Sequence, residues 1–170
     1  MIILVTGPES SGKTTLAREL AWALDGLFVA EAARDFLEAS GGAYTEADLP
    51  LIWQAQREAE DAARASSASF VVCDTGPEVI QIWAEVKYSN SPPDVRRAVE
   101  ARTYDLVLLC LPDLPWVPDP FREAESQGER EALLDRYRAV SAGRRVVEIG
   151  GKNRLGRALT AVFDALPLRR

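Results

Sequence analysis

Gly7-Pro8-Glu9-Ser10-Ser11-Gly12-Lys13-Thr14 is the stretch of this sequence that decides the fold. It matches the pattern G-x-x-x-x-G-K-T, and it lies between an apolar run at residues 2–5 and a segment with helical periodicity. In a strand, loop and helix of this order, the glycines let backbone N–H groups surround phosphate oxygens, and the start of the helix adds positive potential. The stretch therefore predicts a phosphate-binding loop that holds a nucleoside triphosphate.

The same loop predicts how the triphosphate is held. Lys13 is expected to contact the β and γ phosphates, and the Thr14 hydroxyl is expected to bind Mg²⁺. The residues expected to contact the donor nucleotide are Gly7, Glu9, Ser10, Ser11, Gly12, Lys13, Thr14 and Thr15.

The length and the charge of the chain limit its function. With 170 residues the chain suits one domain, residues 1–170, with a sizeable core. The net charge of -6 argues against a broad nucleic-acid surface, which needs clustered Lys and Arg, and it favours small ligands. The apolar run at residues 2–5 is too short for a signal or membrane-spanning segment, and no later run approaches that length. We therefore expect no insertion into a membrane.

Cysteine and histidine usage narrow the chemistry. Cys73 and Cys110 each lie in an apolar, strand-like run, so we expect buried free thiols and a location in the reducing cytoplasm. The sequence has no histidine, which excludes histidine-based triads and the usual zinc sites. Acid–base chemistry must therefore come from carboxylates.

Strand-like and helix-like segments alternate along the chain. Helical patterns separate five expected strands, at residues 2–5, 27–30, 70–74, 106–111 and 145–149. Because parallel neighbours need crossover connections, this order predicts a five-stranded parallel sheet in a three-layer α/β/α domain. The expected fold class is a P-loop NTPase, close in size to the nucleoside and nucleotide kinases, with a small mobile lid at residues 119–130.

Two acidic residues follow strands of the predicted sheet. Glu31 comes after the strand at residues 27–30, and Asp74 ends the strand at residues 70–74. Ligands of open α/β sheets meet the carboxyl ends of strands, so Glu31, Asp74 and the nearby Arg34 are candidates for the site. We assign Asp74 to Mg²⁺ and Glu31 to the hydroxyl group that accepts the phosphate. The residues alone leave these two roles exchangeable.

The last third of the chain adds further candidates. From the lid, either Arg122 or Arg130 can close over the transferred phosphate, since closing lids exclude water. Trp116 lies where a base can stack, or it only anchors its loop, whereas Trp83 is expected to pack at least partly in the core. The stretch Gly150-Gly151-Lys152-Asn153-Arg154 differs from the Asn-Lys-x-Asp pattern of guanine-specific proteins. It favours ATP, with Asn153 as a candidate adenine contact.

Seven motifs along the chain belong together. They are residues 7–14, Glu31-Ala32-Ala33-Arg34, Gly41-Gly42, Cys73-Asp74-Thr75, Ile82-Trp83-Ala84-Glu85-Val86, Tyr104-Asp105-Leu106 and Leu114-Pro115-Trp116-Val117. In this order they resemble the ribosylnicotinamide kinase domain of NadR-type proteins of NAD salvage. The resemblance spans nearly the whole chain, and the Ile-Trp-x-Glu-Val and Leu-Pro-Trp-Val segments are its most specific parts.

This resemblance implies an activity and a set of site residues. The activity is transfer of the γ-phosphate of ATP to the 5′-hydroxyl of nicotinamide riboside, giving nicotinamide mononucleotide, with ATP and Mg²⁺ required. The cationic pyridinium of the riboside would suit Trp83 or Trp116 beside Glu85. The residues that the resemblance places at the site are Lys13, Thr14, Glu31, Arg34, Asp74, Trp83, Glu85 and Arg122.

Members of that family often carry a helix-turn-helix and an adenylyltransferase domain as well. Since this chain starts at its first strand, we expect it neither to bind operator DNA nor to make NAD by itself. Two other functions stay open from the residues alone. The protein can be a kinase of another nucleoside or of a vitamin alcohol such as thiamine, or a nucleotide-binding regulatory ATPase.

Overall fold

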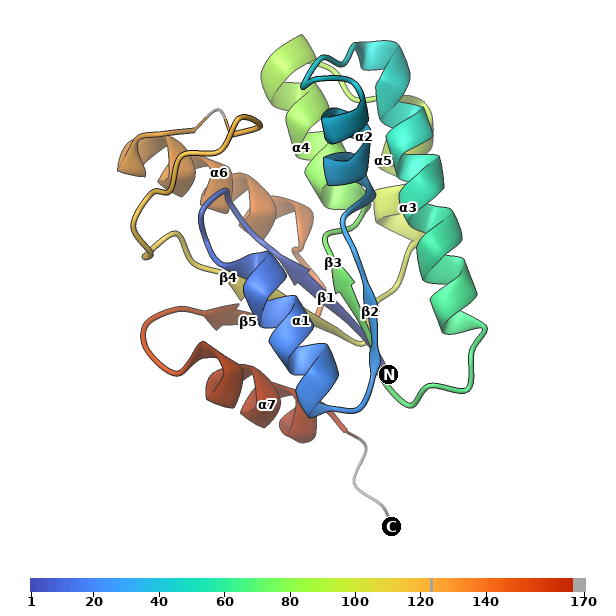
Figure 1. Cartoon of the computed structure of the whole chain (residues 1–170), viewed down its shortest axis with the longest axis vertical. Coiled ribbons are helices and arrows are strands. Elements are labelled where there is room, and N and C mark those ends of the chain that lie inside the picture. Colours follow the sequence, from blue (N-terminus) through green and yellow to red (C-terminus); the bar gives the residue numbers. More distant parts are fainter. Residues whose placement is uncertain (123, 167–170) are drawn as a thin grey trace.

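The computed structural model describes residues 1–122 and 124–166, in which five parallel strands form one sheet between helices (Figure 1). The strands are β1 (Ile2–Thr6), β2 (Leu27–Val29), β3 (Val71–Asp74), β4 (Leu106–Cys110) and β5 (Val146–Ile149). Their order in the sheet is β2-β3-β1-β4-β5, and every neighbouring pair is parallel. The predicted five-stranded parallel sheet is confirmed.

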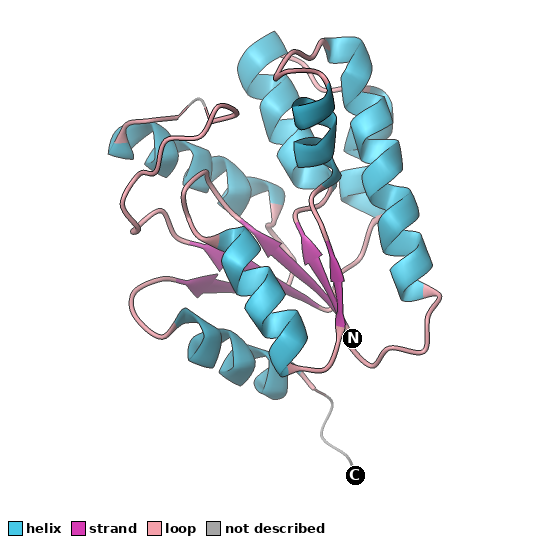
Figure 2. Cartoon of the chain, in the orientation of Figure 1, coloured by secondary structure: helices cyan, strands magenta, loops and turns pink. Residues whose placement is uncertain are grey.

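Seven α-helices and one short 3-10 helix connect and cover the strands in the described residues (Figure 2). The helices are α1 (Lys13–Ala23), α2 (Ala32–Ala39), η1 (Glu46–Asp48), α3 (Leu49–Arg64), α4 (Pro77–Tyr88), α5 (Pro93–Ala101), α6 (Gln127–Val140) and α7 (Arg154–Ala165). None of them is both long enough and apolar enough to cross a bilayer.

Two apolar clusters lie on opposite faces of the sheet. On one face, Leu20 of α1 and Val162 of α7 pack against Leu108 of β4. On the other face, Ile82 of α4 and neighbouring residues of α3, α5 and α6 pack against Leu109. Every residue of β4 is buried, as expected for a parallel strand covered on both sides. The three-layer architecture is therefore as predicted, and Cys73 and Cys110 are buried free thiols within it.

The strand order places the crevice for ligands at β1. After β1 the chain adds β3 and β2 on one side and β4 and β5 on the other, so the connections diverge at the carboxyl end of β1. In sheets of this kind, ligands bind at such a switch point.

The segment predicted as a lid, residues 119–130, is only partly a loop. Ser126 and Glu129 form a capping box that starts α6, so its last four residues, from Gln127 onward, are helical. Glu123 lies outside the described residues. The sequence pattern of a polar segment missed this helix start, because the apolar residues that mark the helix begin only at Leu133.

Candidate functional site

The phosphate-binding loop joins β1 to α1 in the conformation that its glycines allow. Gly7 has a φ of 141°, and a Cβ at this position would lie 2.5 Å from the carbonyl oxygen of Cys110 in β4. Gly12, with a φ of 75°, immediately precedes Lys13, the first residue of α1. No other residue type fits at Gly7 without moving β4, and the loop therefore depends on this glycine.

Lys13, Thr14 and Asp74 lie together at the start of α1. Asp74 pairs in register with Val5 of β1, and its side chain is buried. Burial raises the pKa of the Asp74 carboxyl, while the charge of Lys13 and a hydrogen bond from Thr14 act in the opposite direction. The Asp74 Oδ1 atom has no hydrogen-bond partner among the described residues.

These oxygen atoms suit a magnesium ion. A hydroxyl beside a buried carboxylate with an unused oxygen atom is the kind of donor set that Mg²⁺ binds when it also contacts phosphates. In the described residues there is no cluster of three or more acidic or cysteine side chains that would hold a metal alone. Thr14 and Asp74 would therefore supply only part of the coordination, with phosphate and water oxygens completing it.

Glu31 lies next to this group, at the start of α2. Burial raises the pKa of its carboxyl, Lys13 lowers it, and the neighbouring Asp74 raises it again. The structure thus brings together the lysine and the two carboxylates that the sequence placed at three separate strand ends.

Gln56 of α3 holds the two carboxylate segments beside one another. Its Oε1 atom accepts the N–H of Ala32 at 2.8 Å, and its Nε2 atom donates to the carbonyl of Thr75 at 3.4 Å. Ala32 follows Glu31, and Thr75 follows Asp74, so one buried amide connects both. Sequence reasoning missed this role, because Gln56 shares a helix face with Leu49 and Ile52 and reads as a core position.

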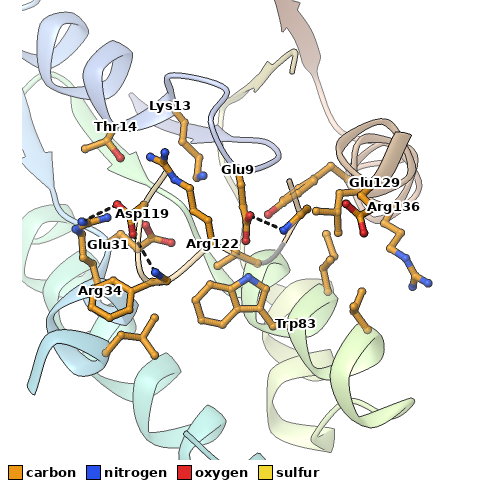
Figure 3. Close-up of a pocket in the computed structure, with 18 of the residues that line it drawn as sticks. Glu9, Lys13, Thr14, Glu31, Arg34, Trp83, Asp119, Arg122, Glu129 and Arg136 are labelled. Carbon is orange, nitrogen blue, oxygen red and sulfur yellow. Dashed lines mark hydrogen bonds and ion pairs between the residues drawn. The ribbon is translucent and has the colours of Figure 1, made fainter. Parts of the chain in front are cut away.

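A cavity of about 410 Å³ opens from the loop toward α2, α4 and α6 (Figure 3). Seven residues predicted for the site line it, namely Glu9, Lys13, Thr14, Glu31, Arg34, Trp83 and Arg122. The sequence did not single out several others that also line it, among them Tyr44, Asp119, Phe121, Glu129, Arg136 and Tyr137. Most of these come from loops or from the polar start of α6, where periodicity carries no signal.

One end of the cavity is aromatic. The rings of Tyr44 and Trp83 are 5.7 Å apart at an interplanar angle of 32°. The ammonium group of Lys87 lies 3.6 Å from the centre of the Tyr44 ring. Nearby, Glu85 forms an ion pair with Arg136 at 3.6 Å; Arg136 lines the cavity, whereas Glu85 is not among the lining residues.

Residues 119–122 and Ala124 line the cavity between α2 and the phosphate-binding loop. Arg34 of α2 donates to the Asp119 carboxylate at 3.0 Å and lies over the ring of Phe121. Arg122 donates from Nη1 to the Ser10 hydroxyl at 2.9 Å, and the Glu9 carboxylate accepts the N–H of Ala124 at 3.0 Å.

The two arginines proposed for the lid have different surroundings. Arg122 lines the cavity and lies 5.9 Å from the centre of the Trp116 ring. Arg130 is buried, and it donates to the Leu114 carbonyl at 2.9 Å and to Gln127 at 2.6 Å. Arg130 therefore fixes the loop after β4 to α6, and Arg122 is the arginine that faces the cavity.

Other predicted contacts lie away from the cavity. Trp116 and Asn153 are not among the lining residues, and Asn153 caps α7 by accepting the N–H of Gly156. Thr15 is exposed on α1. Ser11 is buried, and its backbone carbonyl accepts a hydrogen bond from Arg154 at 2.8 Å. Arg154, which the sequence did not suggest, also donates to the Leu111 carbonyl and pairs with Asp113.

Comparisons with known proteins agree with this architecture. The curated protein "Trifunctional NAD biosynthesis/regulator protein NadR" of Salmonella typhimurium (strain LT2) is 27% identical over 137 residues. The alignment covers 77% of this chain and 33% of the relative. A solved NadR protein in complex with NR has a TM-score of 0.76 and 25% identity, and the match covers 99% of this chain and 52% of the other.

A second solved NadR structure, in complex with NAD and AMP-PNP, gives the same TM-score of 0.76 at 25% identity, covering 99% of this chain and 51% of the other. This chain thus spans a third of the curated relative and about half of the solved chains. The resemblance to NadR-type proteins that the motifs predicted is confirmed. A family model described as an AAA domain matches residues 2–153, which is most of the chain. With its phosphate-binding loop and five-stranded parallel sheet, the chain belongs to this AAA domain family of P-loop proteins.

Proposed function

We propose that this protein is an ATP-dependent kinase that phosphorylates the 5′-hydroxyl of nicotinamide riboside to give nicotinamide mononucleotide. The observation that carries the proposal is that one cavity joins Lys13 and Thr14 to Glu31 and to the Tyr44–Trp83 pair. A donor site, a candidate base and an aromatic platform are thereby accessible to a single small acceptor. The NadR structures with NR and with AMP-PNP support this choice, since their fold matches nearly the whole of this chain.

On the donor side, the residues of the loop hold the triphosphate. Backbone N–H groups of the loop surround phosphate oxygens, and the Lys13 ammonium neutralises charge on the β and γ phosphates. Thr14 and Asp74 would hold Mg²⁺, which neutralises charge that develops on the phosphates during transfer. Arg122, at the cavity wall, adds positive charge near the transferred group.

On the acceptor side, Glu31 orients the hydroxyl and takes its proton. The bond from the acceptor oxygen to the γ-phosphorus forms as the bond from phosphorus to the bridging oxygen of ADP breaks. The acceptor proton moves to the Glu31 carboxylate, which must be ionised to accept it. Lys13, which lowers the pKa of Glu31, helps to keep the carboxylate ionised against the effect of burial.

The aromatic end suits a cationic ring. A pyridinium is attracted to the face of an indole by the quadrupole of the ring. Lys87 already lies against the Tyr44 ring, so we place the pyridinium against Trp83. Acidic side chains of the cavity, Glu9 and Glu129 among them, would attract a cation, and basic side chains such as Lys13 and Arg122 line the cavity as well.

The test is an assay of the purified protein with ATP and Mg²⁺ against nicotinamide riboside, thiamine and a panel of nucleosides. Formation of nicotinamide mononucleotide, at the highest kcat/KM of the panel, is the expected result. Preferred phosphorylation of another alcohol would contradict nicotinamide riboside as the acceptor but would support the kinase activity. Hydrolysis or binding of ATP without transfer to any alcohol would contradict the kinase and favour a regulatory ATPase.

A further inference from the structure

The side chain of Ser10 leaves the phosphate-binding loop and contacts the segment that borders the cavity. Its hydroxyl oxygen accepts hydrogen bonds from Arg122 Nη1 at 2.9 Å and from the N–H of Val117 at 3.2 Å. We call the described residues 117–122 and 124 the lid segment. All the hydrogen bonds that the Ser10 side chain forms in the described residues therefore go to the lid segment.

The backbone of Ser10 has an unusual conformation. Its φ is 52°, in the left-handed region that serine rarely adopts. The loop between Gly7 and Gly12 turns its N–H groups inward around phosphate oxygens. A side chain in the middle of this loop is therefore available for contacts outside the phosphate cradle.

The Arg122 side chain has three contacts in this region, with Ser10, Val117 and Trp116. Besides Ser10, its Nη1 atom donates to the Val117 carbonyl, and its guanidinium lies over Trp116. The Val117 N–H and the Arg122 guanidinium thus converge on one hydroxyl. The hydrogen bond to Ser10 thus joins the Arg122 side chain to the phosphate-binding loop.

We infer that Ser10 is a positioning residue that places Arg122 against the donor phosphates. The inference rests on the proposed kinase function, and it gives Ser10 a role different from that of a phosphate ligand. Because Ser10 sits in the loop that grips the phosphates, the charge of Arg122 is placed by the same segment that places the γ-phosphate. An arginine fixed in this way stabilises the charge of the transition state without further ordering of its side chain.

Two substitutions at Ser10 distinguish the effect of its hydroxyl group from the effect of its backbone strain. Ser10→Ala removes the hydroxyl and leaves the strain of a positive φ, whereas Ser10→Gly removes the hydroxyl and relieves that strain. We expect kcat to fall about tenfold in both variants, as for loss of one charge-assisted hydrogen bond. The KM for ATP should change by less than about twofold, because binding in the ground state is retained. A fall in kcat in Ser10→Ala but not in Ser10→Gly would overturn the inference. A rise in the KM for ATP with kcat unchanged would overturn it as well.

A double-substitution cycle tests whether Ser10 acts through Arg122. Arg122→Gln should lower kcat by about a thousandfold if this arginine stabilises the transferred group. In that background, Ser10→Gly should have an effect of less than about twofold, because the residue it positions is gone. Independent effects, with the two fold-changes multiplying, would contradict the positioning role.

Hydrogen exchange of the lid segment gives a readout that needs no turnover. The Val117 N–H, which bonds to Ser10, should exchange about tenfold faster in both Ser10 variants. The Ala124 N–H, which bonds to Glu9, serves as the reference within the same segment. Unchanged exchange at Val117 would overturn the inference even if the protein is a kinase. If the protein phosphorylates no acceptor, the proposed function fails, and the exchange at Val117 still decides whether Ser10 holds the segment.

Discussion

The Arg34 guanidinium donates to the Asp119 carboxylate at 3.0 Å, and this ion pair joins α2 to the lid segment within the lining of the cavity. The Asp119 carboxyl has a lowered pKa, because hydrogen bonds from Phe121 and Arg34 outweigh the effect of its partial burial. The position of the lid segment and that of α2 are therefore connected through one pair of side chains.

Asp119→Asn should weaken this connection. Since the Arg34 side chain is about half exposed, the pair contributes on the order of 1 kcal/mol or less. We expect the KM for the acceptor to rise by up to about fivefold, with little change in melting temperature. Steady-state kinetics at low and high salt provide the measurement, because a screened ion pair predicts a smaller difference between the two proteins at high salt. Equal KM values for both proteins at low salt would contradict the role.

Lys13→Ala should remove phosphoryl transfer while the fold remains. Lys13 lies at the start of α1 and only partly buried, so its loss leaves no large cavity. We expect the rate to fall by roughly a hundred- to a thousandfold, as for loss of one preorganised charge at a reacting group. Initial rates and a thermal melt of the same sample check both parts, and a folded variant with unchanged turnover would refute the assignment.

Asp74→Asn should alter the dependence on Mg²⁺. The substitution keeps the shape of the side chain but removes the charge, so more Mg²⁺ should be needed to reach half-maximal rate, and the maximal rate should fall. Because burial raises the pKa of Asp74, the neutral amide should not lower the melting temperature. Asp94→Asn, at an exposed position on α5, is the matched control. Identical Mg²⁺ titrations for Asp74→Asn and the control would argue against a metal role.

The rate should depend on pH through Glu31. Its carboxylate must be ionised to accept a proton, and its pKa is raised by burial. The rate is therefore expected to fall on acidification at a higher pH than an ordinary glutamate would give. Glu31→Gln should lower kcat by about a hundredfold or more and remove this acidic limb. A pH profile of kcat is the measurement, and an acidic limb that persists in the variant would assign the base elsewhere.

The stability of the fold should depend on pH through Glu78 of α4. The side chain is fully buried, and burial raises the pKa of its carboxyl to about 7. The unfolded chain releases this proton at a lower pH, so the folded state is favoured below that pH and loses stability as the pH rises to about 7. A shift of this size corresponds to about 3 kcal/mol.

Urea unfolding at pH 5 and pH 8 measures this dependence. Glu78→Gln should reduce the difference in unfolding free energy between the two pH values, because the amide does not titrate. A pH dependence that is the same in the wild type and in the variant would show that another group is responsible.

The phosphate-binding loop and the positions of the strands along the chain could be predicted because each depends on local pattern. The motif at residues 7–14 and the continuous apolar run of β4 each specify a structure without reference to distant residues. Lys13, Glu31 and Asp74 could be placed in one site because parallel strands bring their carboxyl ends to the same edge.

The cavity wall could not be predicted, because it depends on contacts between segments far apart in the chain. Tyr44 precedes a short 3-10 turn and meets Trp83 only through the packing of α4. Arg122 and Arg130 are both arginines of one polar stretch, and only the start of α6 at Gln127 separates a cavity residue from a buried one. Glu85, in contrast, lies two positions after Trp83 on the same helix, and it reaches Arg136 of the cavity lining without lining the cavity itself.

The hydrogen bonds of Gln56 connect the candidate site to residues of the core. Because the Gln56 amide joins Ala32 to Thr75, the separation of the neighbouring Glu31 and Asp74 carboxylates depends on the position of α3. Ile52, one turn earlier on the same helix, packs in the core and helps to fix the position of α3. A conservative exchange such as Ile52→Val would therefore alter turnover without altering any group that touches a ligand. The residues whose substitution affects the candidate site thus include residues of the hydrophobic core.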